Sequence, residues 1–214
     1  MPGINETASY RSNMYGILAL AFSPPPADAE RLHNAISDAI ASLQASESPS
    51  SDDCGGWHPS FPQLSKEYLR LFVGPGHIPC PPYESVHRKD RPKFERGLVM
   101  GPSASDVRRT YSQAGVDIAK KFTDLPDHVA VEMEFMHFLC SQELKLAEAG
   151  NLQQAEKMRA MQRKFLEEHI KPWIETFADS VTESTTSPFY RDAANLLKTF
   201  TNADANDIAG GDPE

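Results

Sequence analysis

The sequence predicts an all-α protein, a single multi-helix globular domain with roughly seven to ten helices. Apolar residues recur at helical spacing in several long segments, and no segment shows the strict apolar/polar alternation of a half-buried strand. The chain has no Asn-Gly hairpin signal and no repeat of fixed period. Of its 17 prolines, 12 lie between Pro24 and Pro102, so the second half of the chain is free to form long helices.

The first half is predicted to alternate helices with rigid loops. The first helix covers about residues 7–22, where apolar side chains share one face until the three prolines at 24–26 end it. A second amphipathic helix covers residues 27–45, and the Ser-, Asp- and Gly-rich residues 46–56 form a linker or loop. A third helix covers about residues 62–73, with its apolar side chains on one side.

The helix after the proline-rich loops is predicted to begin at Ser103 and to end near Gly115. Asp106 follows Ser103 by three residues, where its carboxylate can return a hydrogen bond to the cap, as in a capping box. These signals place the start of the helix at Ser103.

The longest periodic segment runs from Pro126 to Ala149. Asp124 or Asp127 is the expected N-cap, because a carboxylate there can accept hydrogen bonds from the free N–H groups of the first turn. Gly150 occupies the position that favours glycine after the end of a helix.

Two further helices are predicted in the last third of the chain. Asn151 caps the first of them, which Pro172 kinks or restarts. The Ser187-Pro188 pair supplies a cap and an N1 proline for the last helix, which is expected to end at about Thr201. We therefore expect a helical domain over residues 1–204 and an acidic, disordered tail over 205–214.

Composition narrows the class of protein. The chain has 21 Lys and Arg against 30 Asp and Glu residues, a formal net charge of −9, which argues against a general nucleic-acid binder because phosphate neutralisation needs a basic face. Three cysteines do not supply a framework of paired disulfides. The apolar stretch at 14–22 is too short to cross a bilayer, and the polar residues before it lack the pattern of an export signal. We expect a cytoplasmic protein.

A stiff segment from Tyr68 to His87 is the first candidate for function. The predicted helix ends at Gly74-Pro75, and further prolines then alternate with apolar residues and with Tyr83. The loop either spans two helices as a connector or forms a binding surface, since loops on a rigid scaffold often carry binding sites.

The second candidate lies at the start of the long helix. Glu132 projects onto the apolar face, with His128 one turn earlier. A carboxylate on a buried face must be neutralised, paired or hydrogen-bonded. Glu132 therefore either bonds His128 or another helix inside the core, or lines a groove with His128 for a cationic or donor-rich ligand.

Metal binding is an alternative interpretation of the same residues. His128 and Glu132 have the spacing of two ligands on one helix face, which would suit a metal-dependent helical enzyme. The residues Cys54, His58, His77 and Cys80 can be written as a four-ligand zinc set. No phosphate-binding loop, dinucleotide-binding turn or nucleophile elbow is present, so no conventional enzyme site is visible.

At these two segments the sequence resembles the TorD/DmsD family of redox-enzyme maturation chaperones. An aromatic residue, Leu-Phe, Gly-Pro and Pro-Pro-aromatic-x-Ser form the first motif, matched by Tyr68, Leu71, Phe72, Gly74, Pro75, Pro81, Pro82, Tyr83 and Ser85. Pro-Asp-His leading into a helix with Glu and Phe forms the second, matched by Pro126, Asp127, His128, Glu132 and Phe135.

The resemblance implies an all-helical, non-catalytic, cytoplasmic chaperone that binds the twin-arginine signal peptide of a molybdenum-cofactor oxidoreductase and assists its maturation before export. It implies no cofactor, no nucleic acid, no stable membrane insertion, and a monomer or homodimer. The two segments are expected to meet in an apolar, acid-edged groove for the peptide. The expected peptide-binding residues are Tyr68, Leu71, Phe72, Gly74, Pro75, Pro81, Pro82, Tyr83, Glu84, Ser85, Asp127, His128, Glu132 and Phe135.

Overall fold

Nine α-helices and no β-strand make up the described part of the computed structural model, residues 4–44, 60–92, 99–116 and 125–209, so the predicted all-α class is confirmed. Two of the helices, α3 and α7, continue directly into a π-helical turn, Leu69–Val73 and Leu166–Ile170. The helices are α1 (Ile4–Ala21), α2 (Ala29–Gln44), α3 (Phe61–Tyr68), α4 (Glu84–His87), α5 (Pro102–Gln113), α6 (Val129–Glu148), α7 (Leu152–Phe165), α8 (Ile174–Ser184) and α9 (Pro188–Ala209).

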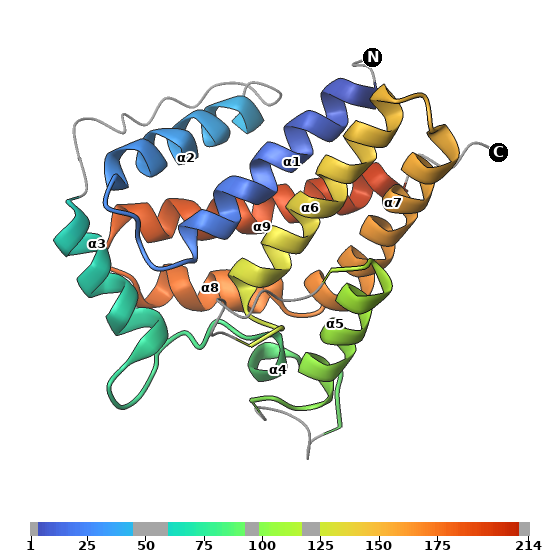
Figure 1. Ribbon diagram of the computed structural model, residues 1–214. Helices are drawn as coiled ribbons and strands as arrows, with labels where there is room; N and C mark the ends of the chain where they lie inside the picture. The colour runs from blue at the N-terminus through green and yellow to red at the C-terminus, as the bar shows by residue number, and fades with distance from the viewer. Residues whose placement is uncertain (1–3, 45–59, 93–98, 117–124, 210–214) are drawn as a thin grey trace.

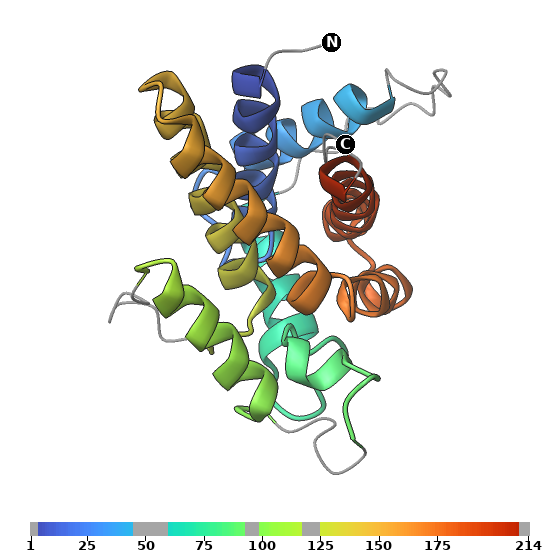
Figure 2. The same ribbon diagram turned by 90° about the vertical axis from the view of Figure 1, so that its right-hand side faces the viewer.

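Helices α1 and α6 form the most extensive helix pair and lie side by side in both views (Figures 1 and 2). Gly16 permits this close approach, because a Cβ atom at that position would lie 3.3 Å from Nδ1 of His137. One turn earlier on α1, the Ser12 hydroxyl lies 3.0 Å from the same nitrogen and 2.8 Å from Oγ of Ser141. A missing side chain and short polar contacts thus bring the two helices together.

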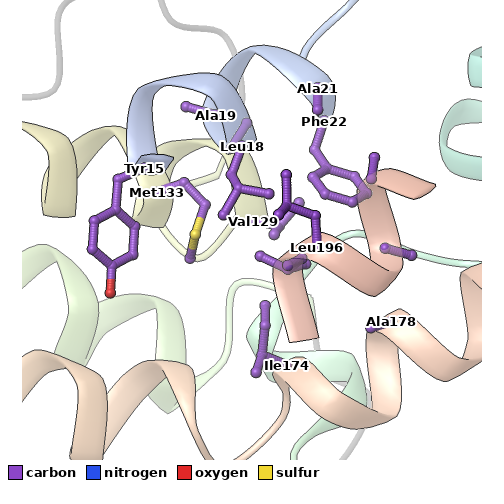
Figure 3. Close-up of a cluster of buried hydrophobic side chains, with 14 of the residues drawn as sticks. Tyr15, Leu18, Ala19, Ala21, Phe22, Val129, Met133, Ile174, Ala178 and Leu196 are labelled. Atoms are coloured by element: carbon purple, nitrogen blue, oxygen red, sulfur yellow. The ribbon is translucent and has the colours of Figure 1, made fainter. Parts of the chain in front are cut away.

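The remaining long helices pack around this pair. Helix α7 folds back along α6, and α8 and α9 pack against each other behind α1 and α6 in the view of Figure 1. Figure 3 shows Leu18 of α1 and Phe22, which follows α1, close to Met133 of α6, Ile174 of α8 and Leu196 of α9, all of them at most 2% exposed. Burial of each such side chain contributes about 1.5–3 kcal/mol, so four sequence-distant helices are held by one core.

Helix α5 begins one residue earlier than predicted. Gly101 precedes its first residue, Pro102, and Ser103 lies inside the first turn with its side chain buried. The expected cap at Ser103 is therefore wrong. The ring of Pro102 already fixes φ at a helical value and lacks the N–H that a cap would satisfy, which favours proline at this position.

Helix α6 begins at Val129 and is capped by His128, whose Nδ1 accepts a hydrogen bond of 3.1 Å from the N–H of Ala130. The expected cap at Asp127 is wrong, because that carboxylate accepts the N–H of Ser85 instead, at 3.1 Å. The other expected cap, at residue 124, lies outside the described residues.

Several predicted boundaries are confirmed. Gly150 has φ of +74° after the end of α6, and the side chain of Asn151 accepts a hydrogen bond from the N–H of Gln154 at the start of α7. Helix α9 begins at Pro188, as predicted. The predicted linker over residues 46–56 lies outside the described residues.

The C-terminal boundary differs from the prediction. Helix α9 continues through Ala209, and its last turns bury Asp204, Ala205 and Ile208, each at most 4% exposed. The expectation of an end near Thr201 and of a disordered tail is thus wrong for residues 205–209, because these side chains pack onto the rest of the protein. Residues 210–214 lie outside the described residues.

The π-helical turn after α3 ends at Gly74, whose N–H donates to the carbonyl of Leu69 at 2.8 Å. Gly74 has φ of +91°, and a Cβ there would lie 3.3 Å from the backbone nitrogen of Gly76. Gly76 has a similar φ of +98°, but a Cβ there would meet nothing within 4 Å among the described residues. A side chain at either glycine would strain the backbone, but only at Gly74 would it also crowd a neighbouring atom.

We predict that Gly74→Ala destabilises the protein by more than the ~1–2 kcal/mol expected for left-handed strain alone. The matched variant Gly76→Ala carries the strain without the close contact, so its free energy of unfolding should fall only by that ~1–2 kcal/mol. Urea unfolding of both variants and the wild type gives the comparison. Equal losses would show that the contact with Gly76 is relieved without cost.

Candidate functional site

The two motif segments identified in the sequence meet in the structure. The carbonyl of Pro82 accepts the N–H of Val129 at 2.9 Å, and the carbonyl of Asp127 accepts the N–H of Glu84 at 2.9 Å. The side chain of Asp127 adds the hydrogen bond from Ser85 described above. The predicted juxtaposition of the proline-rich segment and the start of the long helix is therefore correct. In Figure 1 the start of α6 lies beside α4.

Tyr83 and His128 lie opposite each other at the centre of this junction. They form an isolated antiparallel bridge, the only β-type pairing within residues 4–44, 60–92, 99–116 and 125–209. Their rings meet edge to face with centroids 5.4 Å apart. His128 also caps α6 through Nδ1, so this single residue links the proline-rich loop to the start of the helix.

A cluster of three fully buried carboxyl groups lies behind the junction: Glu84, Asp127 and Glu132, each 0% exposed. Oε2 of Glu84 lies 3.2 Å from Nδ1 of His169, and Oε1 pairs with the guanidinium of Arg88. The loop, α6 and the π-helical turn after α7 thus converge on Glu84.

Glu132 accepts a hydrogen bond of 3.2 Å from the indole N–H of Trp173, which immediately precedes α8. The sequence left two interpretations of Glu132, and the structure favours the first, in which it bonds another helical segment inside the core.

Burial changes the protonation of this cluster. Desolvation raises the pKa of Glu132 well above its ordinary value, and the neighbouring carboxyl groups of Glu84 and Asp127 raise it further. Desolvation also raises the pKa of Asp127, against the hydrogen bonds from Ser85. Within the described residues, Oε1 of Glu132 and Oδ1 of Asp127 have no hydrogen-bond partner. Burial and the neighbouring carboxyl groups therefore favour the neutral acid form of Glu132.

The aromatic residues predicted to line the groove lie in the core. Tyr68, Leu71 and Phe72 are at most 5% exposed, and the ring of Phe72 packs edge to face on Tyr190 at 5.5 Å. Phe135 is 4% exposed and packs on Tyr111 and Phe165 with centroid distances of 4.5 and 4.8 Å. The expected apolar, acid-edged groove is therefore not open: its apolar walls and its acids are covered by other helices.

The open apolar surface lies on the opposite side of the same helix. A hollow of about 630 Å³ separates α3 and its π-helical turn from the loop that follows, and we call it the α3 hollow. Its large apolar residues Phe61 and Leu69 are 43% and 48% exposed. The α3 hollow is lined by Phe61, Pro62, Ser65, Lys66, Leu69, Arg70, Gly74, Pro75, His77 and Pro79.

Of the predicted site residues, Gly74 and Pro75 line the α3 hollow, whereas Pro81 and Tyr83 are half-buried at the junction. Phe61 and Leu69 were missed. The available signal was that both are apolar residues outside the buried stripe of an amphipathic helix, where polar residues are expected.

A second cavity, of about 550 Å³, opens between α5 and the π-helical turn after α7, and it is polar. Each of its Arg and Lys side chains lies within 4 Å of a carboxylate, so the cavity balances its own charge. The pairs are Arg88–Asp90 at 2.8 Å, Arg91–Asp106 at 2.9 Å, Arg109–Asp106 at 3.2 Å and Lys164–Glu168 at 3.9 Å.

The metal interpretations gain no support. No group of three or more His, Cys, Asp or Glu side chains in the described part of the chain is arranged to hold a metal ion. Of the proposed zinc set, the thiol of Cys80 is buried and donates to the carbonyl of Ser180 at 3.2 Å, while Cys54 and His58 lie outside the described residues. Across those same described ranges, no helix is long and apolar enough to cross a membrane.

Curated relatives carry the same name repeatedly. Over 151 residues the chain is 29% identical to the chaperone protein TorD of Photobacterium profundum, a match that covers 69% of this chain and 65% of that protein. It is 25% identical over 142 residues to the chaperone protein TorD of Vibrio cholerae, covering 66% and 60%. The match thus spans less than two thirds of the length of these relatives.

A solved structure establishes the fold independently. The crystal structure of a protein described as a candidate redox enzyme maturation protein from Archaeoglobus fulgidus superposes with a TM-score of 0.56, at 24% identity, over 89% of this chain and 93% of that chain. The family model for the nitrate reductase delta subunit matches residues 27–179, which contain both motifs and the junction between them. The chain therefore belongs to the nitrate reductase delta subunit family, and within it to the proteins that resemble the TorD chaperones.

Proposed function

We propose that the protein is a non-catalytic, cytoplasmic chaperone that binds the twin-arginine signal peptide of a molybdenum-cofactor oxidoreductase and assists its maturation before export. The TorD names of the relatives support a chaperone role. The observation that carries the peptide-binding proposal is the α3 hollow, an open apolar surface beside the Gly74-Pro75 loop of the first motif.

The α3 hollow suits the apolar stretch of a leader. Phe61 and Leu69 present roughly half of their surfaces to solvent, and a peptide that covers them gains hydrophobic free energy. The N–H of Cys80 donates to the carbonyl of Leu71 at 3.0 Å, which fixes the loop against the core. A wall that is already ordered favours peptide binding, because less conformational freedom is lost.

The predicted site residues divide into two proposed roles. Gly74, Pro75, Pro81 and Tyr83, which are exposed or half-buried, contact the peptide. The buried residues position the loop against α6 and the core, and they are Tyr68, Leu71, Phe72, Pro82, Glu84, Ser85, Asp127, His128, Glu132 and Phe135. The net charge of −9 speeds encounter with a basic leader in a salt-dependent manner.

We predict that Leu69→Asp weakens the binding of a synthetic twin-arginine leader by about tenfold or more, because apolar contact is lost and a charge is desolvated. Isothermal titration with leaders of molybdenum-dependent reductases provides the measurement. Leu152→Asp is the matched control, since Leu152 is 64% exposed and lies on α7, outside the α3 hollow.

Two further variants test the junction. Tyr83→Ala should weaken leader binding through a lost contact, and His128→Ala through loss of the cap that orders the junction. Equal affinities for wild type, Leu69→Asp, Tyr83→Ala and His128→Ala would remove both surfaces from the site. Binding of a scrambled leader as tight as that of the intact one would refute the proposed function.

A further inference from the structure

A smaller hollow, of about 330 Å³, continues from the α3 hollow towards the start of α9 and is distinct from the polar cavity beside α5. It is the second hollow along α3. Lys66 and Arg70 line both hollows, so the two form one continuous surface along α3. The second hollow contains Glu67, the one acidic residue among the residues that line either of the two. An apolar surface therefore leads directly to an anion.

Glu67 is fixed by contacts that do not involve Arg70. Its Oε1 accepts a hydrogen bond of 2.8 Å from the hydroxyl of Thr185 and one of 3.0 Å from the N–H of Thr186. The Glu67 side chain is only 11% exposed. The hydrogen bonds from Arg70 and from these two threonines lower the pKa of Glu67 to about 2, so the group is ionised.

Arg70 completes this arrangement from the solvent side. Its Nε and Nη2 each donate to one oxygen of Glu67 at 2.8 Å, and Nη2 also donates to the carbonyl of Ser184 at 2.7 Å. Its side chain is 43% exposed and comes from only three residues along the same helix. A second guanidinium that replaces Arg70 makes the same hydrogen bonds to Glu67 and Ser184, and the half-exposed Arg70 side chain returns to water, so the exchange costs little.

We propose that Glu67 and the Ser184 carbonyl form a guanidinium-binding site that Arg70 occupies in the free protein and that an arginine of a bound leader takes over. This inference rests on the proposed function and identifies the subsite for the charged part of the leader. The apolar stretch next to that arginine then lies in the α3 hollow. The site accommodates one arginine, because Lys66 on the shared rim repels a second cation.

The geometry selects arginine over lysine. Two parallel N–H donors meet the two oxygens of Glu67, and only a planar guanidinium makes this bidentate contact. A leader in which lysine replaces arginine keeps its charge but makes a single contact. The ratio of affinities for the arginine and lysine leaders therefore reports occupation of this site.

The first experiment measures this ratio by titration. In Arg70→Ala the competing guanidinium is gone, so we expect the preference for arginine over lysine to rise about tenfold above that of the wild type. In Glu67→Gln the amide oxygen still accepts from Thr185 and Thr186, but an NH₂ group faces the guanidinium, so the preference should vanish. Arg109→Ala is the control: it removes an exposed arginine that pairs with an aspartate three residues away, outside both hollows. It should leave the preference for arginine over lysine unchanged.

A preference that stays the same in Arg70→Ala and Glu67→Gln would overturn the inference while leaving leader binding intact. Failure of the wild type to bind any intact leader better than a scrambled one would instead refute the proposed function. The subsite then has a separate test that needs no leader.

The second experiment probes the site with a small molecule. Butylguanidinium added to Arg70→Ala should shift the backbone amide resonance of Thr186, which bonds Glu67, while butylammonium should shift it several-fold less. The double variant Arg70→Ala/Glu67→Gln should respond equally weakly to both compounds. An equal response of Arg70→Ala to the two compounds would overturn the guanidinium site whatever the leader does.

Discussion

Asp204→Ala is expected to lower the free energy of unfolding by about 3–5 kcal/mol, because it leaves a buried guanidinium without its main counter-charge. Asp204 lies on α9 and is 4% exposed, as is Arg11 on α1. Its Oδ1 and Oδ2 accept from Nε and Nη2 of Arg11, the second at 2.9 Å, and Oδ2 also accepts from the Tyr15 hydroxyl at 2.6 Å. The variant therefore leaves two buried side chains short of an acceptor.

The remaining partners of Arg11 do not replace Asp204. Nη1 donates to Oε1 of Gln162 at 2.6 Å, and Glu143 lies 3.6 Å from the same nitrogen. Nε and Nη2 face Asp204 alone among the described side chains. The network thus joins α1, α6, α7 and α9 through one cation.

Urea unfolding of Asp204→Ala against the wild type measures this loss. Asp179→Ala is the matched control, since Asp179 also pairs with a cation, Lys198 at 2.9 Å, but its side chain is 52% exposed. The control should change the free energy of unfolding by less than about 1 kcal/mol. A loss in Asp204→Ala no larger than that of the control would show that Arg11 is satisfied without Asp204.

Glu132→Gln is expected to flatten the pH dependence of stability and to make the protein more stable than the wild type at about pH 8. The raised pKa of Glu132 means that the folded protein holds a proton that the unfolded chain releases above its ordinary pKa of 4.5. This contribution is complete below pH 4.5 and is lost as the pH rises through the folded-state pKa. The loss in wild type is at most about 1.4 kcal/mol per pH unit for one proton.

Glutamine is a close mimic of the protonated acid. Its amide oxygen can accept from the indole N–H of Trp173, and the neutral amide is not repelled by the carboxyl groups of Glu84 and Asp127. Urea unfolding between about pH 5 and pH 9 gives the slope for each protein. Glu134→Gln, on the exposed side of the same helix, should keep the wild-type slope.

Some pH dependence should remain in Glu132→Gln, because the pKa of Asp127 is also raised by desolvation and acts in the same direction. Identical slopes for Glu132→Gln and the wild type would contradict a neutral Glu132. They would place the proton on another carboxyl of the cluster.

The local signals of the sequence predicted most of the helices because those signals depend on neighbouring residues. Pro188 and Asn151 begin helices wherever their caps fit, and Gly150 ends α6 with a positive φ. The extension of α9 beyond Thr201 depends instead on Asp204, whose partner Arg11 is 193 residues away. No local pattern near residue 204 carries that information.

The sequence predicted which segments meet at the site, but it did not predict which of their side chains are exposed to solvent. The motifs placed Asp127 and His128 next to the proline-rich loop, and the backbone hydrogen bonds show this pairing. Periodicity shows that Tyr68 and Phe72 share a helix face, but it does not show that Phe22, which follows α1, packs on that face. Burial of an apolar stripe is decided by which distant helix packs on it, and that requires the tertiary structure.

The bridge between Tyr83 and His128 has a mechanical consequence. Two backbone hydrogen bonds tie the loop to the start of α6, and α6 packs extensively along α1. A force on the loop is therefore transmitted to the packing between α1 and α6. We therefore expect the backbone of the loop to keep its shape on binding, so that the leader must adopt a conformation that fits it. Differences in affinity among client leaders should then follow how readily each one takes up the bound conformation in isolation.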